Sequence, residues 1–506
     1  MNSTQPTLAA LPKNLTVPVL SSPSPCASRG ERVGRGDGFG SSKVKTTFLA
    51  ILTLLLTSTH LQAQEAKPAK AKPVNLVVQA EPRQTLWGFG CSQVGRGSVP
   101  EAVQAELCDR VFGELKMNVL RLWVESGGKS DLAEMQQSFL KSYPDTRRFV
   151  EDVRRRGVDT LLLAPARGEG RPKEPMPEYA HKLAEFIAFL RTKLGVEIQA
   201  TGIANEPQGF TPAQAAECVR ALRSELDGRG LRNVGIVAPE SASADELALQ
   251  LIRAIKADPI AWAGLRGIAT HSYNMAVTPQ FTEIIAGTGK EYWQTEAGDN
   301  GNESPADANR AATAAARFLN DLNQGVTHWI WFIGFHDSLD MTQDRDNATK
   351  LMIYDRRQQR IVPHLKYGWF RQLRAAFPNG SRLHPLRAEP GGSLVYSYGK
   401  KPALNAAAAQ RPDGGWSLGA VNLTGVEPNT EIAQYHPTTP LAVTWEVPAL
   451  AAIPELTFAV ARSSATERFA PAGQVVMRAG RLTLEIAARE LLTLTTNPGL
   501  PEDAKR

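Results

Sequence analysis

Eight short apolar runs recur along the middle of the chain, and longer amphipathic segments separate them. Successive runs start between 25 and 41 residues apart. One strand followed by a crossover helix takes about 30 residues or more, so each interval fits one βα unit. Such strand–helix alternation predicts a parallel sheet covered by helices. The eight runs are residues 86–90, 119–124, 160–165, 199–205, 235–239, 267–271, 292–296 and 327–332.

The segments between the runs have the pattern of helices. Within residues 178–194, Tyr179, Leu183, Ile187 and Leu190 share one face, which is the spacing of a helix that packs on a core. Eight βα units over roughly 255 residues match an α/β fold, the (β/α)8 TIM barrel, which is typically about 250 residues long. A doubly wound sheet is the alternative, although that fold commonly carries fewer strands.

The pattern changes after about Gly380. Short alternating or apolar segments follow, separated by turns rich in glycine and proline such as residues 412–415. This pattern predicts an all-β antiparallel sandwich. A strand at residues 74–78, ahead of the barrel, is expected to join it. The predicted sandwich strands are residues 393–398, 416–423, 442–447, 456–460, 474–478 and 481–486.

Basic charge is concentrated at the start of the chain. The 506 residues have a net charge of +6, and residues 1–45 hold six basic and two acidic side chains, a net charge of +4. The remainder is therefore close to neutral and lacks the basic surface expected for binding to a phosphate backbone. We expect no nucleic acid among the partners.

Residues 43–63 have the three parts of a secretory signal. Lys43 and Lys45 precede the apolar residues 46–56, and Ala63 supplies a small residue for cleavage. An anchor helix is the alternative, but a membrane span needs about 20 apolar residues, so no stable membrane insertion is expected. The sequence predicts a secreted or periplasmic protein. Its expected parts are a leader with signal peptide (1–64), a linker (65–73), an N-terminal strand (74–85), a catalytic barrel (86–376), a sandwich (377–498) and a tail (499–506).

The cysteines do not form a disulfide framework. Cys26 lies in the leader, which leaves Cys91, Cys108 and Cys218 in the body of the chain. Three thiols cannot all pair, and none lies in the signature of a catalytic cysteine. They are expected to be small buried residues, and whether any two of them form a disulfide stays open.

Two of the eight runs lead into a glutamate. In a TIM barrel the active site lies at the carboxyl-terminal ends of the strands. Glu206 follows the fourth run directly, and Glu296 ends the seventh. The two carboxyl groups are therefore expected to face each other across the barrel mouth. Cleavage of a glycosidic bond needs such a pair, one to protonate the leaving oxygen and one to attack the anomeric carbon or activate water.

Other strand ends carry residues that would support this chemistry. Arg121 in the second run, close to the barrel axis, would keep Glu296 ionised. Tyr273 follows the sixth run and would hydrogen-bond the same carboxylate, and His271 is expected to be a hydrogen-bonding neighbour. Trp331 in the eighth run would offer a platform for the apolar face of a sugar ring.

Each of these residues also has a plainer interpretation. A glutamate at a strand end is often a solvated loop residue. Arg121 would also fit a structural ion pair, because ion-pair networks perturb charges too. Trp329 is expected to belong to the core.

Several familiar motifs are absent from the sequence. Gly128-Lys129-Ser130 has Trp123 where a phosphate-binding loop requires its first glycine. Gln93 stands where a dinucleotide-binding fingerprint requires its third glycine. The histidines form no His-Glu-x-x-His motif, and there is no Gly-x-Ser-x-Gly elbow. We therefore expect no cofactor and no metal.

The placed motifs resemble a known class of enzyme. Asn205-Glu206-Pro207 after strand four and Thr295-Glu296 on strand seven resemble retaining glycoside hydrolases with (β/α)8 barrels. Further segments make the chain most similar to glycoside hydrolase family 30, over about residues 74–498. Residues 87–90 resemble that family's opening strand, 366–370 and 377–383 its passage from barrel to sandwich, and 411–416 and 420–423 its sandwich.

The resemblance implies roles for individual residues. It makes Glu206 the acid/base, Glu296 the nucleophile and Asn205 a ligand of the sugar 2-hydroxyl, in a retaining enzyme that cleaves β-glycosidic bonds of a carbohydrate substrate by double displacement. Residues 91–96 differ from the loop that family members carry near the sugar site, so neither the sugar, the linkage nor the choice between internal and terminal cleavage is implied.

A second class of function stays open at this point. A non-catalytic carbohydrate-binding protein could retain the same barrel, since a fold does not determine a function. The presence of both glutamates favours the enzyme. The oligomeric state is not indicated by the sequence.

Overall fold

The computed structural model describes residues 70–92, 94, 99–124, 131–165, 174–273, 278–389, 394–395, 402–427 and 435–496. The predicted leader with its signal peptide, the predicted tail and most of the predicted strand at 393–398 lie outside these residues. Within the described ranges, no helix has the length and apolar character needed to cross a membrane.

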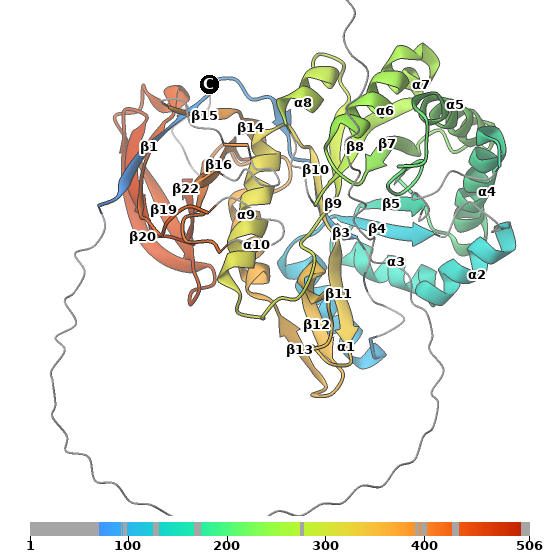
Figure 1. Cartoon of the computed structure of the whole chain (residues 1–506), viewed down its shortest axis with the longest axis horizontal. Helices are drawn as coiled ribbons and strands as arrows, with labels where there is room; N and C mark the ends of the chain where they lie inside the picture. The colour runs from blue at the N-terminus through green and yellow to red at the C-terminus, as the bar shows by residue number, and fades with distance from the viewer. Residues whose placement is uncertain are drawn as a thin grey trace, which may run out of the picture. The chain divides into compact units, whose positions relative to one another are not determined.

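Eight parallel strands close into a barrel, in the order β10-β3-β4-β5-β6-β7-β8-β9. Figure 1 labels all of them except β6. The barrel closes where β10 pairs with β3, with His328 opposite Gly88. The predicted (β/α)8 barrel is therefore confirmed. The strands are β3 (Gly88–Ser92), β4 (Val119–Val124), β5 (Thr160–Pro165), β6 (Ala200–Thr201), β7 (Gly235–Ser241), β8 (Leu265–Ser272), β9 (Glu291–Ala297) and β10 (His328–Trp331).

Helices connect the barrel strands, and side chains cap the first turn of several of them. Thr211 and Gln214 form a capping box at the start of α5, and Asp307 accepts hydrogen bonds from the first turn of α9. The helices are α1 (Glu101–Cys108), a π-helix (Asp109–Glu114), α2 (Leu132–Ser142), α3 (Thr146–Arg155), α4 (Met176–Leu194), α5 (Pro212–Gly228), α6 (Glu246–Ala257), α7 (Pro259–Gly264), α8 (Pro279–Ile285), α9 (Ala308–Asn323) and α10 (Leu365–Ala376).

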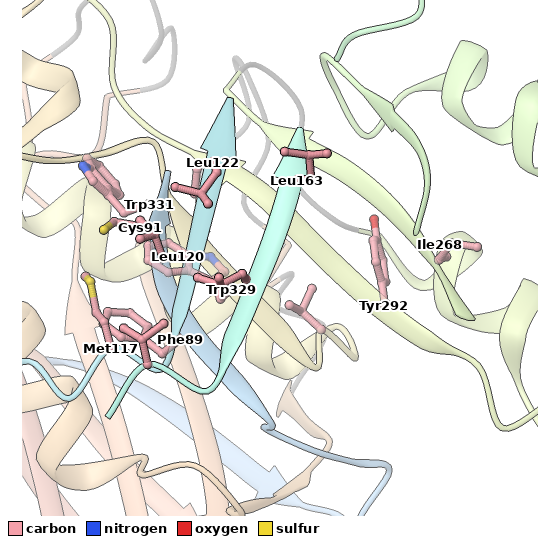
Figure 2. Packing of buried hydrophobic residues seen from close by; sticks show 14 of the residues in the cluster. Phe89, Cys91, Met117, Leu120, Leu122, Leu163, Ile268, Tyr292, Trp329 and Trp331 are labelled. Atoms are coloured by element: carbon pink, nitrogen blue, oxygen red, sulfur yellow. The ribbon is translucent and has the colours of Figure 1, made fainter. Parts of the chain in front are cut away.

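Two apolar layers hold the barrel together, one inside it and one between strands and helices. Alternation along the strands separates them, because successive side chains point to opposite faces. Leu120 and Leu122 of β4 belong to the outer layer, part of which Figure 2 shows, whereas Val119 points inward. The inner cluster takes one residue from each of seven strands: Val119, Leu162, Ala200, Val237, Ala269, Trp293 and Ile330.

The β-rich part forms one sheet of eleven strands with its own apolar core. β1, which precedes the barrel in the chain, pairs with β15 and β18 of this sheet; the β1–β18 pair is parallel and the other pairs are antiparallel. The predicted all-β domain after the barrel is confirmed. The strands are β1 (Lys72–Val78), β2 (Gln84–Thr85), β14 (Arg382–His384), β15 (Leu386–Glu389), β16 (Leu404–Gln410), β17 (Trp416–Asn422), β18 (Leu441–Glu446), β19 (Glu455–Ser463), β20 (Ala470–Arg478), β21 (Arg481–Ile486) and β22 (Leu491–Thr496).

A third, three-stranded sheet follows the last barrel strand directly. It consists of β11 (Ile333–Ser338), β12 (Lys350–Asp355) and β13 (Arg360–Pro363), and the sequence analysis did not predict it. An isolated bridge between Val94 and Phe335 ties β11 to the segment after β3. The β11 strand therefore continues close to the first strand of the barrel.

Gly90 is required by the close approach of β3 and β4. A Cβ atom at this position would lie 2.1 Å from the backbone oxygen of Val119. Gly90→Ala should therefore lower the free energy of unfolding by about 1–3 kcal/mol, because the clash is with backbone and the neighbouring strand must move. Gly113→Ala is the matched control, since a Cβ there meets no atom within 4 Å. Urea unfolding followed by tryptophan fluorescence measures both variants; equal stability of the two would contradict the prediction.

Candidate active site

The carboxyl-terminal ends of the barrel strands bring together six of the seven residues predicted for the site. Val119 points into the barrel, and Arg121 lies two residues further along β4, so it has the same inward direction at the mouth. His271 is in β8 and Glu296 in β9. The other members are Asn205 and Glu206, after β6, and Tyr273, which follows β8.

Arg121 and Tyr273 hold the carboxylate of Glu296. Nη1 of Arg121 donates to Oε1 at 2.5 Å, and the Tyr273 hydroxyl donates to Oε2 at 2.9 Å. The Arg121 side chain is fully buried and that of Glu296 is only 3 % exposed. Burial raises the pKa of Tyr273 well above its usual value, and the neighbouring Glu296 and Glu206 raise it further, so the phenol stays a donor.

Asn205 and His271 connect Glu206 to this group. Nη2 of Arg121 donates to Oδ1 of Asn205 at 2.8 Å, which leaves the amide nitrogen as the donor of that side chain. Nδ1 of His271 lies 3.0 Å from Oε1 of Glu206 and 3.5 Å from Oε2 of Glu296. The Glu206 side chain is 16 % exposed, more than its partner, and so it is the carboxyl that solvent reaches more easily.

His271 is neutral at physiological pH. Its side chain is fully buried, and its pKa is lowered to about 4; burial is the main cause, Glu296 opposes the shift and Arg121 contributes to it. A neutral imidazole between two carboxyl groups can exchange hydrogen bonds with them without adding a positive charge.

The same atoms are close enough to bind a metal ion. One oxygen of Glu206, one oxygen of Glu296 and a ring nitrogen of His271 all lie within 4.8 Å of one another. However, the Arg121 guanidinium already donates to Glu296 at 2.5 Å. A fixed cation on that carboxylate disfavours a second one beside it.

The backbone at the mouth departs from regular strand geometry. The pairing of β9 with β8 shifts register between Thr270 and His271, so that Glu296 instead of Thr295 lies opposite His271. Such β-bulges re-aim side chains and are common next to active sites. Glu206 has a left-handed backbone with φ of 53°, which is uncommon for a residue other than glycine.

The prediction that Trp331 forms a sugar platform is wrong. Its side chain is fully buried, its indole N–H donates to the backbone oxygen of Thr349 at 2.7 Å, and its ring packs on Phe370 at 5.3 Å. Figure 2 shows it beside Cys91 in the outer layer. Strand alternation explains this, because Ile330 points into the barrel and Trp331 therefore points away from it.

Aromatic side chains at the mouth come instead from Trp123 and Phe332. Both are partly exposed, and their rings pack edge to face at 6.3 Å. Phe332 also packs against Tyr273 at 6.0 Å, and the Trp123 indole donates to Ser92 Oγ at 2.9 Å. Phe332 lies two residues after Ile330, which points into the barrel. The alternation of side chains along β10 therefore predicts Phe332, and not Trp331, at the mouth.

Glu240 is a further side chain of the site that was not predicted from the sequence. It lies in β7, is fully buried and accepts a hydrogen bond from Nε of Arg121 at 3.3 Å. The predicted fifth run stopped at residue 239, one position short. The rule that identified Glu206 and Glu296, a glutamate at the end of a barrel strand, would have found it.

Comparison with known proteins gives similarity in structure alone. No protein-family model matches the sequence, and no curated protein sequence matches it. A glycoside hydrolase family 30 subfamily 8 xylanase from Clostridium acetobutylicum superposes with a TM-score of 0.61 at 16% identity, over 84% of this chain and 99% of that one. An endo-β-1,6-glucanase gives 0.57 at 13%, over 84% and 94%. A family 51 arabinofuranosidase from Xanthomonas axonopodis pv. citri gives 0.54 at 14%, over 84% and 100%.

These similarities define the class of the fold, that of barrel glycoside hydrolases with an accompanying β-domain. Within this class, the chain has the fold of glycoside hydrolase family 30, as the resemblance in sequence predicted. At sequence identities of 13–16%, the similarity shows a shared fold. The activity has to be inferred from the geometry of the site.

The low pKa of His271 makes a specific prediction about acid stability. The unfolded chain takes up a proton on this residue near its ordinary pKa of 6.5, and the native protein does so only near 4. Between these values the unfolded state binds more protons, so the stability that the neutral imidazole contributes is lost as pH falls from about 6.5 to 4. His271→Gln should flatten the melting-temperature profile in this window. A titration of the His271 ring near pH 6.5, seen by NMR in the native protein, would contradict the prediction.

Proposed function

We propose that the protein is a retaining glycoside hydrolase that cleaves β-glycosidic bonds of a carbohydrate by double displacement. The observation that carries this proposal is the closeness of the two glutamates, since oxygens of Glu206 and Glu296 lie within 4.8 Å of each other. Retaining enzymes need carboxyl groups about 5–5.5 Å apart, whereas inverting enzymes separate them by about 6.5–9.5 Å to admit a water molecule. The close pair favours retention.

The surroundings of the two carboxyl groups support different roles for them. Glu296 touches a guanidinium and a phenol hydroxyl, and both stabilise its ionised form. It is the proposed nucleophile. Glu206 is more exposed and faces the neutral ring of His271, surroundings in which a carboxyl group can give up and regain a proton. It is the proposed acid/base.

The proposed reaction has two steps that use these groups in turn. Glu296 attacks the anomeric carbon while the protonated Glu206 passes its proton to the leaving oxygen. The glycosyl–enzyme ester on Glu296 is then attacked by water, and the Glu206 carboxylate takes the proton of that water. The hydrogen bonds from Tyr273 and Arg121 to Glu296 weaken as this carboxylate loses its charge, and they form again when the ester is cleaved.

Carbohydrate recognition is proposed for the side chains around this pair. The Asn205 amide nitrogen can donate to a sugar hydroxyl, because its oxygen is taken by Arg121. Trp123 and Phe332 present partly exposed aromatic rings at the mouth. The similar structures include a xylanase, a β-1,6-glucanase and an arabinofuranosidase, so a panel of β-linked polysaccharides and aryl glycosides is the appropriate screen. The leader at residues 1–64 supports export of the enzyme.

Replacing the nucleophile should stop turnover of every substrate. Glu296→Gln removes the group that forms the covalent intermediate, and kcat should fall by about 10⁴-fold or more. Glu291→Gln is the matched control, since Glu291 begins the same strand at the opposite end of the barrel. It should leave kcat/KM within about twofold. Release of the aglycone from the substrate found in the screen measures both variants, and residual activity above one per cent in Glu296→Gln would disprove the assignment.

Replacing the acid/base should affect the two steps differently. Glu206→Gln should spare the first step for a dinitrophenyl glycoside, because this leaving group needs no proton, and the second step should become slow without a base. A burst of dinitrophenol followed by a slow steady state is expected. Azide should restore turnover and yield a glycosyl azide; a variant without burst and without rescue would contradict the role of Glu206.

The stereochemistry of the first product tests the mechanism as a whole. Double displacement inverts the anomeric carbon twice, so the sugar released from a β-glycoside should initially be the β-anomer. Proton NMR in the first minutes of hydrolysis, before mutarotation, distinguishes the anomers. An initial α-anomer would show single displacement and would overturn the retaining mechanism.

A further inference from the structure

Glu240 is a third carboxyl group at the barrel mouth, and the mechanism above does not use it. Its side chain has no exposed surface, and its Oε1 lies 3.3 Å from both Nε and Nη2 of Arg121. Arg121 thus lies between two carboxyl groups, Glu240 on one side and Glu296 on the other. A single buried cation is shared by two acidic side chains.

The backbone of Glu240 is hydrogen-bonded to Glu206, the proposed acid/base. The Glu206 N–H donates to the Glu240 backbone oxygen at 3.0 Å. Both residues have left-handed backbones, with φ of 53° for Glu206 and 62° for Glu240. Residues other than glycine adopt this left-handed conformation mainly where the surrounding structure enforces it. Such positions cluster at functional sites.

The fold makes room for this carboxyl group in two ways. The pairing of β7 with β8 shifts register between Pro239 and Ser241, so Glu240 is the extra residue of a β-bulge. Across from it, a Cβ on Gly202 would lie 1.8 Å from Oε2 of Glu240. Only glycine at position 202 leaves the space that the carboxyl group occupies.

We propose that Glu240 is a positioning residue for both glutamates of the site. Its backbone oxygen fixes the peptide of Glu206, and its carboxyl group holds the Arg121 guanidinium in the orientation that serves Glu296 and Asn205 at once. This inference rests on the proposed glycosidase function and deepens it.

The protonation state of Glu240 follows from the charges around it. The charged groups that face it are Arg121 from β4 and Glu296 from β9. Burial raises the pKa of Glu240 to about 7; Arg121 opposes this shift and Glu296 adds to it. Below pH 7 the carboxyl group is therefore mainly protonated and offers Arg121 a neutral acceptor. Above pH 7 two carboxylates share the one guanidinium.

The kinetic test compares variants that keep or remove the contact with Arg121. Glu240→Ala removes the acceptor of Nε and should lower kcat per active site by about 100-fold, because small displacements of reacting groups cost rates of this order. KM should change less than threefold. Glu240→Gln keeps an acceptor oxygen and should lose less than tenfold. The amplitude of the thermal unfolding transition measures the folded protein in each sample, so a loss of folded protein does not enter kcat.

Gly202→Ala tests the same contact with Glu240 intact. The added methyl group occupies the space of Oε2 and displaces the carboxyl group from Arg121, so kcat should fall at least tenfold. Glu246→Gln is the control, because its side chain at the start of α6 is exposed and pairs with Arg253 of the same helix; it should behave as the wild type. A kcat per active site within threefold of wild type in Glu240→Ala and Gly202→Ala would overturn the proposal, as would equal losses in Glu240→Gln and Glu240→Ala.

A second measurement does not depend on activity. The unfolded chain releases the Glu240 proton near pH 4.5 and the native protein near 7, so the native state binds more protons in between, and stability is lost as pH rises through this window. The melting temperature of Glu240→Gln, relative to wild type, should therefore rise by a few degrees, about 3 °C or more, from pH 5 to pH 8. A constant difference would show that Glu240 is not a buried protonated group beside Arg121. If the wild type hydrolyses no glycoside, the proposed function fails while this measurement still decides the state of Glu240.

Discussion

The geometry of the site depends on one buried cation, the Arg121 guanidinium. A buried arginine is tolerated only when its N–H groups find acceptors and its charge finds a partner. Here Nη1 donates to Glu296 and Ser92, Nη2 to Asn205 and Nε to Glu240. These four acceptors come from four different strands or the segments that follow them. Each of them is therefore fixed in place by the need to satisfy the same side chain.

The barrel has an apolar interior, whereas the backbone at its mouth is irregular. Its interior below Arg121 is apolar and takes one side chain from each of seven strands, Val119 and Ile330 among them. Two register shifts lie at the mouth, one in β7 beside Glu240 and one in β9 just before Glu296. A rigid apolar layer supplies the stability that the strained backbone at the mouth lacks, which is the usual division in enzymes built on this fold.

Sequence patterns predicted the barrel because its signal is repeated eight times, and a repeated spacing tolerates errors in any one run. Single positions had no such redundancy. Trp331 was assigned to the mouth although strand alternation directs it outward, and Glu240 was missed because its run ended one residue early. β16, whose sequence is LNAAAAQ, has the composition of a helix and is a strand because it pairs with β14 and β17. Tertiary pairing overrides local propensity there.

Burial and partners, more than position along the strands, separate the roles of the two proposed catalytic glutamates. Both follow or end barrel strands, and both have His271 within 3.5 Å. Glu296 also accepts hydrogen bonds from a cation and a phenol, the surroundings proposed for the nucleophile. Glu206 has the neutral imidazole and greater exposure, the conditions in which a carboxyl group can exchange a proton with a substrate and with water. The two side chains are identical, and the guanidinium that donates to Glu296 gives that carboxyl group surroundings different from those of Glu206.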